Sequence, residues 1–185
     1  MDISIGTKSS HRLHSHDLNF IFKLRKFVFH DRLGWQVNCF DGMEYDAFDD
    51  DTAQYLTVKK DDVVVATCRI ISTLRPTMLQ SIFPQLLRGE VFVESPAVYE
   101  ISRLASAGNV STTSGIMPIV LRGLRQHAKQ NKIEQYVFVT TTSIERMLRR
   151  YHLEIGRFGD GVVTEISGVP SVALKLNPSS IPSDC

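Results

Sequence analysis

The chain has 185 residues, of which 43% are hydrophobic and 22% are charged, and its formal net charge is +1. These values predict a soluble globular protein and exclude a strong overall field for nucleic acid or an anionic membrane. We see no apolar run long enough to cross a bilayer and no signal-peptide core near residue 1, so we expect a cytoplasmic protein without a membrane partner. Cys39, Cys68 and Cys185 are widely spaced, which favours a reducing compartment over a disulfide framework.

The first predicted element is a helix over residues 17–33, with Asp17 as the N-cap and Gly34 as the end. Arg25 lies at helical spacing from apolar residues, so this arginine is expected on or beside the buried face. Residues 35–51 have no clear period and many acidic residues, and we expect them to form an ordered loop.

Beyond residue 51 the apolar spacing predicts alternating strands and helices. Strands are expected over 54–60, 63–71, 98–107, 136–140, 162–167 and 171–176, an apolar turn over 78–89, and helices over 114–131 and 142–153. The first two strands are expected to form a hairpin around Lys60-Asp61-Asp62. A Thr142-x-x-Glu145 capping box should open the last helix. This order favours a three-layer αβα sandwich with a mixed, mostly antiparallel, twisted sheet, in one domain over residues 1–177 with a flexible tail over 178–185.

Two stretches concentrate charged and aromatic residues where a core is expected, which indicates a water-poor, charged site for a zwitterionic small molecule. The first stretch contains Arg25, Phe29, Trp35, Asp46 and Asp49, and the second contains Arg69, Phe83, Glu100 and Arg103. Structural salt bridges and ordinary core packing remain open as alternatives for these residues. Strict alternation places Glu100 and Arg103 on opposite faces of their strand, unless a bulge re-aims one of them.

Metal, thiol and serine chemistry have little support. The acidic run over 44–51 lacks the spacing of a calcium loop, and no histidine stands near it in the sequence. No serine occupies a G-x-S-x-G elbow, and neither Cys39 nor Cys68 has a catalytic context. We assign no function to the six histidines, including His11 and His14.

The charged and aromatic residues resemble the functional pattern of the acyl-homoserine-lactone synthases, the autoinducer synthases. RLGW, the E-x-D-x-F-D run from Glu44 to Asp49, FPQLLRG and YEISRLA are each similar to family segments. The resemblance runs from about Leu24 to about Leu174, and Tyr99, where the family usually has tryptophan, is a mild departure. The expected order of elements is also similar to the N-acetyltransferase (GNAT-like) architecture, although a fold alone does not establish a function.

The resemblance implies a reaction. The α-amine of S-adenosylmethionine attacks an acyl thioester carried on acyl carrier protein, and the methionine carboxylate then closes on its own γ-carbon and releases methylthioadenosine. S-adenosylmethionine is thus a consumed substrate, and no cofactor is expected. Glu100, as general base, and Arg103 are the implied catalytic residues. The implied S-adenosylmethionine side consists of Arg25, Phe29, Trp35, Asp46, Asp49, Arg69 and Phe83.

The second half of the chain is implied to bind the acyl chain and its carrier. The candidate acyl pocket consists of Met78, Leu79, Met117, Leu121, Phe138, Val139, Met147 and Leu148. The candidates for docking the acidic carrier protein are Arg146, Arg149 and Arg150, for which a solvated basic face is the alternative. Because synthases that prefer 3-oxo chains tend to have threonine where this sequence has Phe138, we expect an unsubstituted acyl chain.

Two other functions remain open, an N-acetyltransferase that uses acetyl-CoA and a non-catalytic GNAT-like binding module. The first would need a Q/R-x-x-G-x-G/A loop that holds the CoA pyrophosphate through backbone N–H groups. The corresponding segment reads LASAGNVSTTSGIM and lacks that pattern.

Overall fold

The computed structural model describes residues 1–8, 13, 15–108 and 110–183, so His11, His14 and Cys185 lie outside the described residues. The chain forms two compact units. The first contains Met1–Ile70 and Arg103–Leu124, and the second contains Ile71–Ser102 and Arg125–Asp184. Strand β6 (Val98–Ser106) and helix α3 (Val110–Asn131) each begin in one unit and end in the other. The single domain expected over residues 1–177 therefore stays a prediction.

The first unit is built on a sheet whose strands pair in the order β1, β4, β5 and the end of β6. Strand β1 spans Asp2–Thr7, β4 spans Gln54–Lys60 and β5 spans Val63–Ser72. The predicted hairpin between β4 and β5 is confirmed. Asp61 and Asp62 form its turn with φ angles of 50° and 61°, a left-handed conformation that Asp tolerates better than most residues.

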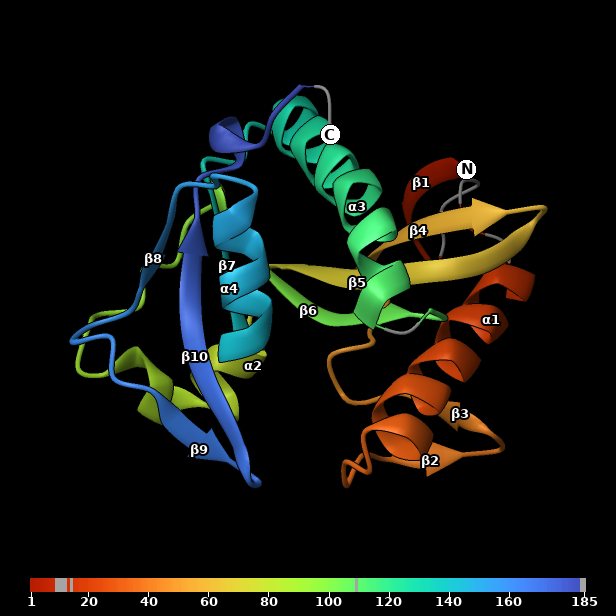
Figure 1. Cartoon of the computed structure of the whole chain (residues 1–185), viewed down its shortest axis with the longest axis horizontal. Coiled ribbons are helices and arrows are strands. Elements are labelled where there is room, and N and C mark those ends of the chain that lie inside the picture. Colours follow the sequence, from red (N-terminus) through yellow and green to blue (C-terminus); the bar gives the residue numbers. More distant parts are fainter. Residues whose placement is uncertain (9–12, 14, 109, 184–185) are drawn as a thin grey trace. The chain divides into compact units, whose positions relative to one another are not determined.

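Helices cover both faces of this sheet (Figure 1). On one face, α1 (Ser15–Arg25) buries Ile21 and Leu24 in a cluster with Tyr55 of β4. On the other face, α3 lies so close that a Cβ added at Gly123 would stand 2.7 Å from Leu56 Cδ1. Tyr55 and Leu56 are neighbours on β4 and point to opposite faces, as strand alternation requires.

The predicted helix over 17–33 is two elements, since α1 continues into a π-helix, η1, over Lys26–Arg32. The backbone N–H of Leu33 donates to the carbonyl of Val28, five residues earlier, at 3.1 Å. π-Helical turns are rare and occur frequently at functional sites. The loop expected over 35–51 contains a short hairpin of β2 (Cys39–Phe40) and β3 (Met43–Glu44).

The second unit contains a sheet that begins with the first part of β6. Strand β7 (Gln135–Thr141) pairs parallel with β6, and β10 (Val169–Leu176) pairs antiparallel with β7. The short strands β8 (Ile155–Arg157) and β9 (Thr164–Ile166) both pair with β10. The helical elements that belong wholly to this unit are α2 (Met78–Ser81), η2 (Pro84–Leu87), α4 (Thr142–Arg150) and η3 (Pro178–Ser180).

Two apolar layers build the core of the second unit. Leu79 of α2 and Leu86 of η2 are buried in one cluster with Val137 of β7 and Ala173 of β10. On the opposite face of β7, the hydroxyl of Tyr136 lies 2.8 Å from Nδ1 of His127 in α3. The α/β class expected from the sequence is thus confirmed.

Several predicted boundaries were wrong. Helix α4 is capped by Thr141, whose hydroxyl accepts the N–H of Ile144, so the capping box on Thr142 does not form. Strands β1 and β8 were not predicted. The tail expected to be flexible contains the η3 turn, and Ile181 is only 1% exposed. Among the described residues, none of the helices combines the length and hydropathy of a membrane-spanning segment.

Candidate active site

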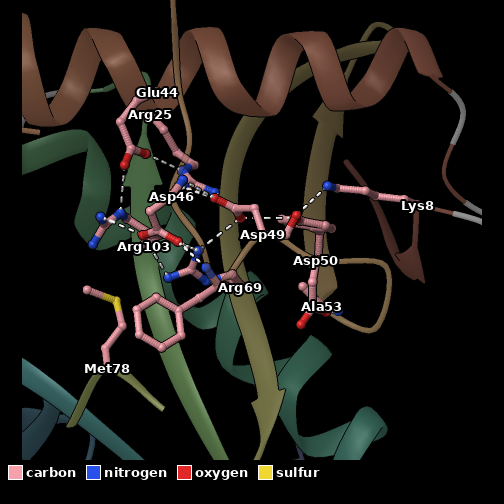
Figure 2. A network of polar contacts seen from close by, with 12 residues as sticks. Lys8, Arg25, Glu44, Asp46, Asp49, Asp50, Ala53, Arg69, Met78 and Arg103 are labelled. Atoms are coloured by element: carbon pink, nitrogen blue, oxygen red, sulfur yellow. Dashed lines mark hydrogen bonds and ion pairs between the residues drawn. The ribbon is translucent and has the colours of Figure 1, made fainter. Parts of the chain in front are cut away.

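Six side chains of the first unit form a closed ring in which arginines and carboxylates alternate (Figure 2). Its members, in order around the ring, are Arg25, Glu44, Arg103, Asp46, Arg69 and Asp49. They come from α1, the β3 strand, the loop after β3, β5 and the end of β6. The sequence-predicted residues Arg25, Asp46, Asp49, Arg69 and Arg103 are therefore brought together.

Arg25 joins the two most buried carboxylates of the ring. Its Nε donates to Glu44 Oε2 at 2.5 Å, and its two terminal nitrogens donate to the Asp49 oxygens at 2.7 and 2.8 Å. A two-pronged arginine–carboxylate contact fixes orientation as well as energy. Arg25 therefore holds two carboxylates in place rather than presenting its charge to solvent.

Arg69 and Arg103 close the ring through Asp46. Arg69 donates to both oxygens of Asp46, at 2.5 and 3.2 Å, and lies 2.9 Å from Asp49. Nη2 of Arg103 lies 2.8 Å from Asp46 Oδ2, and its Nε donates to Glu44 Oε1 at 3.0 Å.

Solvent reaches only one edge of the ring. The side chains of Asp46 and Arg103 are 13% and 14% exposed, whereas those of Arg25, Glu44, Asp49 and Arg69 are at most 1% exposed. The accessible edge thus presents one carboxylate and one guanidinium side by side. This is the charge pattern that a bound amino acid, with its ammonium and carboxylate, would complement.

The ring shifts the pKa values of Asp49, Arg25 and the neighbouring Tyr55. Burial alone would raise the pKa of Asp49, but the hydrogen bonds and charges of Arg25 and Arg69 more than offset it and hold that pKa well below the usual range. Burial would lower the pKa of Arg25, and Asp49 and Glu44 raise it instead. Burial, followed by the charge of Asp49, raises the pKa of Tyr55, whose hydroxyl donates to Asp49 Oδ1 at 2.9 Å.

Two aromatic side chains lie beside this ring. Phe29 of η1 stacks on Trp35 with ring centroids 5.4 Å apart and an angle of 17° between the planes. The guanidinium carbon of Arg103 lies 5.6 Å from the centroid of the Phe29 ring, within the range of a cation–π contact. Phe29 is buried and Trp35 is half-buried, so Trp35 presents part of its ring to solvent.

Arg103 reaches the ring because its backbone breaks the regular pleat of β6. Its φ is 54°, a left-handed value that is uncommon for a non-glycine residue and costs about 1–3 kcal/mol. Glu100 and Arg103 serve different neighbours, since Arg103 contacts Glu44 and Asp46 whereas Glu100 contacts the backbone of Met78 and Leu79. Backbone strain of this size persists where the surrounding contacts over-determine it, and here the contacts are those to Glu44 and Asp46.

Glu100 lies in the second unit and is 1% exposed. Its Oε1 accepts the backbone N–H of Met78 at 3.0 Å, and its Oε2 accepts that of Leu79 at 2.7 Å. The carboxylate thus binds the first turn of α2. The hydroxyl of Thr77 caps the same turn, where it accepts the N–H of Gln80.

The predicted acyl-pocket residues come from both units and, along β7, from both faces of the strand. Leu79 and Val139 pack in one cluster, which also contains Phe83, so the structure places Phe83 with the apolar residues of the second unit. Phe138 pairs with Leu174, and alternation along β7 places it on the face opposite Val139. Met78, Met147 and Leu148 belong to the second unit, whereas Met117 and Leu121 belong to the first.

The three docking candidates on α4 are not equivalent. All three are exposed, and Arg149, whose side chain is 52% exposed, also donates to Glu145 at 2.8 Å. Glu145 is only 2% exposed and also accepts two hydrogen bonds from Arg157, at 3.0 and 2.7 Å. The bonds from Arg157 are the largest influence that lowers the pKa of Glu145, ahead of those from Arg149.

Three members of these networks were not predicted from the sequence: Glu44, Tyr55 and Arg157. Glu44 is the first residue of the E-x-D-x-F-D run but was not among the predicted site residues. The signal that could have indicated the burial of Glu44 is its position two residues before Asp46, in the short hairpin. Tyr55 and Arg157 carried no signal beyond being polar residues within strands.

Comparison with known proteins identifies the family. The family model described as "Autoinducer synthase" matches residues 9–180. An acyl-homoserine-lactone synthase of Pseudomonas aeruginosa is 34% identical over 166 residues, which cover 86% of this chain and 83% of the relative.

Solved structures agree with that match. The acyl-homoserine-lactone synthase LasI superposes with a TM-score of 0.87 at 33% identity and covers 96% of this chain and 89% of its own. TofI, solved in a ternary complex with an inhibitor and MTA, superposes with a TM-score of 0.83 at 28% identity and covers 96% and 92%. The GNAT-like sandwich expected from the sequence is therefore confirmed. The chain belongs to the autoinducer synthase family, whose curated relatives are acyl-homoserine-lactone synthases, and it is an acyltransferase.

Proposed function

We propose that the chain makes an acyl-homoserine lactone from S-adenosylmethionine and an acyl chain carried as a thioester on acyl carrier protein. The observation that carries the proposal is the ring of alternating charges, whose accessible edge consists of Asp46 and Arg103. S-adenosylmethionine is consumed in this reaction, and no further cofactor is proposed.

We assign the binding of S-adenosylmethionine to the first unit. Asp46, at the accessible edge, accepts the α-ammonium group, while Arg25, Arg69 and Asp49 hold Asp46 and Arg103 in position. Phe29 and Trp35 enclose the adenosyl group, since aromatic faces pack well against flat rings and exclude water. The complex of TofI with MTA supports this assignment, because MTA, methylthioadenosine, is the product that such a site would release.

Acyl transfer requires an unprotonated amine. Glu100 is the proposed general base and takes the proton through a water molecule. The amine nitrogen then forms the amide bond to the acyl carbon, the carbon–sulfur bond of the thioester breaks, and the carrier thiol leaves. Arg103 is assigned to the thioester oxygen, where negative charge develops.

Lactone formation needs no covalent bond to the enzyme. The methionine carboxylate attacks the γ-carbon of the same molecule, the bond from that carbon to the sulfonium sulfur breaks, and methylthioadenosine leaves. Both reacting groups belong to one bound molecule, so holding them close together supplies much of the rate enhancement.

Two features support acyl carrier protein as the donor over acyl-CoA. The exposed Arg146 and Arg150 on α4 suit an acidic protein partner, and residues 104–117, which run from the end of β6 into α3, lack the pyrophosphate loop pattern. Cys39 and Cys68 are free cysteines, which suits a reducing compartment, so we propose a cytoplasmic location.

Phe138 supports an unsubstituted acyl chain, since its phenyl ring offers no hydrogen-bond donor to a 3-oxo group. The test uses purified enzyme, S-adenosylmethionine and one chain length in four forms, plain and 3-oxo, on carrier protein and on CoA. Mass spectrometry of the lactone gives the rates. We expect the plain carrier-protein donor to react fastest. A faster 3-oxo donor would contradict the role of Phe138, and a faster CoA donor would contradict the carrier assignment.

A further inference from the structure

Glu100 is the buried carboxylate whose contacts the reaction alone does not explain. Both of its oxygens accept backbone N–H groups, those of Met78 and Leu79, which are the first two residues of α2. A general base needs access to one proton, and this arrangement instead uses the carboxylate as an anchor for a turn.

The turn that Glu100 anchors is short, and a small set of side-chain hydrogen bonds holds its first residues. Helix α2 has four residues, and its start is held by the Thr77 hydroxyl, by the Gln80 side chain and by Glu100. Within this turn, the N–H groups of Ser81, Ile82 and Phe83 donate to the carbonyls of Thr77 and Met78. The N–H groups of Met78 and Leu79 are among the first four of the helix, which lack intrahelical partners, so Glu100 supplies acceptors that the helix itself cannot.

The side chains that follow these two N–H groups belong to the apolar part of the second unit. Leu79 is 0% exposed and packs with Val98, Val137 and Val139, and Met78 is 8% exposed. Displacement of the α2 backbone would move Leu79 within that cluster, because close-packed interiors transmit shifts.

We propose that Glu100 is a positioning residue that anchors α2 in its ionised form, and that uptake of a proton by Glu100 loosens this anchor. The proton adds to one Oε atom and forms an O–H bond, which removes the charge from both N–H···O contacts. Charge-assisted hydrogen bonds are roughly twice as strong as neutral ones, so both contacts to α2 weaken together. The amine-derived proton of the proposed reaction, on whose assignment this step rests, would thus be felt at Met78 and Leu79.

The anchor can be tested without catalysis by amide hydrogen exchange, read by NMR at single residues. Glu100→Gln keeps the shape and one carbonyl acceptor but removes the charge. We expect the Met78 and Leu79 amides to exchange at least about tenfold faster. The matched control is Glu134→Gln, the same change at an exposed glutamate of the same unit, which should leave both rates unchanged. Unchanged rates in a folded Glu100→Gln protein would overturn the proposal.

The wild-type protein gives a second test that needs no variant. The amide proton shifts of Met78 and Leu79 should titrate with the same midpoint as the carboxyl carbon of Glu100, because the proton enters the groups that they contact. Independent midpoints would overturn the proposal even if Glu100→Gln failed to fold.

Measurements of kcat and KM distinguish the anchoring role of Glu100 from its proposed role as general base. If Glu100 acts only as a base, Glu100→Gln lowers kcat for every acyl donor by one factor and leaves the exchange rates alone. If it also positions α2, Thr77→Ala, which leaves the Glu100 side chain intact, should raise the KM for the acyl donor more than the KM for S-adenosylmethionine. Absence of lactone from the wild type would reject the proposed function, whereas the exchange result decides the anchor by itself.

Discussion

The backbone N–H of Trp35 donates to the carbonyl oxygen of Phe29 at 2.8 Å, and the rings of the same two residues stack 5.4 Å apart. The two residues are thus coupled twice, once through the backbone and once through the side chains. The π-helix η1 makes this possible, since its wider turn leaves carbonyls that reach beyond the usual partner four residues on. The stack stands beside Arg103 at the accessible edge of the charged ring.

Trp35 should report the binding of S-adenosylmethionine, because it is the sole tryptophan of the chain. We expect its fluorescence to change with saturation when S-adenosylmethionine or methylthioadenosine is added. Trp35→Phe should keep part of the stack, while Trp35→Ala should raise the KM for S-adenosylmethionine by about threefold to tenfold, since an aromatic pair contributes about 0.5–1.5 kcal/mol. A fluorescence signal that ignores both ligands would contradict the placement of the adenosyl group.

Substitutions at Asp49 and Asp46 should differ in how strongly they affect the free energy of unfolding and turnover. Asp49→Asn breaks the two-pronged contact with Arg25 in a fully buried pair, so we expect the free energy of unfolding to fall by about 3–5 kcal/mol. Asp46→Asn acts at the accessible edge and should cost less, about 1.5–3 kcal/mol, yet remove S-adenosylmethionine-dependent turnover. Urea denaturation and turnover measured on both variants check this. An Asp46→Asn enzyme of wild-type activity would be inconsistent with the assigned role.

His127 should make stability depend on pH in the second unit. Burial lowers the pKa of His127 to about 4, whereas an unfolded histidine titrates near about 6.5. Between these values the unfolded chain binds the extra proton, so stability is greatest above about pH 6.5 and falls as the pH decreases toward 4. The full effect is at most about 3 kcal/mol.

The measurement is the free energy of unfolding from urea titrations at several pH values. His127→Gln should flatten the fall between about pH 6.5 and 4 relative to the wild type. His152→Gln, at an exposed histidine of the same unit, serves as the control and should keep the wild-type slope. Equal slopes in all three proteins would show that His127 does not cause the pH dependence.

Charge reversal on α4 tests carrier docking. Arg146→Glu with Arg150→Glu should raise the KM for the acyl carrier protein donor by about tenfold or more and leave the KM for S-adenosylmethionine unchanged. The wild-type KM for the donor should rise with salt, and the variant should lose much of that dependence. Arg122→Glu, at an exposed arginine of α3, is the matched control for each of the two single reversals, Arg146→Glu and Arg150→Glu. An equal effect from Arg122→Glu would show that the change in KM follows from net charge and not from a docking surface on α4.

Local patterns predicted the parts of the fold whose causes are local. The hairpin at Asp61 and Asp62 follows from turn chemistry, and the presence of Arg25 on a buried helix face follows from helical spacing. Strands β1 and β8 escaped prediction because β1 gains its stability from pairing with β4, and β8 is only three residues long.

The closure of the ring could not be predicted, because its partners meet only through the tertiary fold. Glu44 and Arg103 are 59 residues apart in the sequence. The Thr142 capping box failed because Thr141 is the N-cap, and the side chain of Glu145 instead binds Arg149 and Arg157, the latter twelve residues away. Strict alternation along β7 places Phe138 and Val139 on opposite faces of the strand, yet both were predicted to line one acyl pocket.

The most direct test identifies the products of one reaction mixture that contains the enzyme, S-adenosylmethionine and a plain acyl chain on carrier protein. Liquid chromatography with mass spectrometry can follow both products over time. We expect methylthioadenosine and the acyl-homoserine lactone to appear together in equal amounts, and neither to form with Asp46→Asn or Glu100→Gln. Acyl release without methylthioadenosine, or transfer to the amine without lactone, would contradict the account.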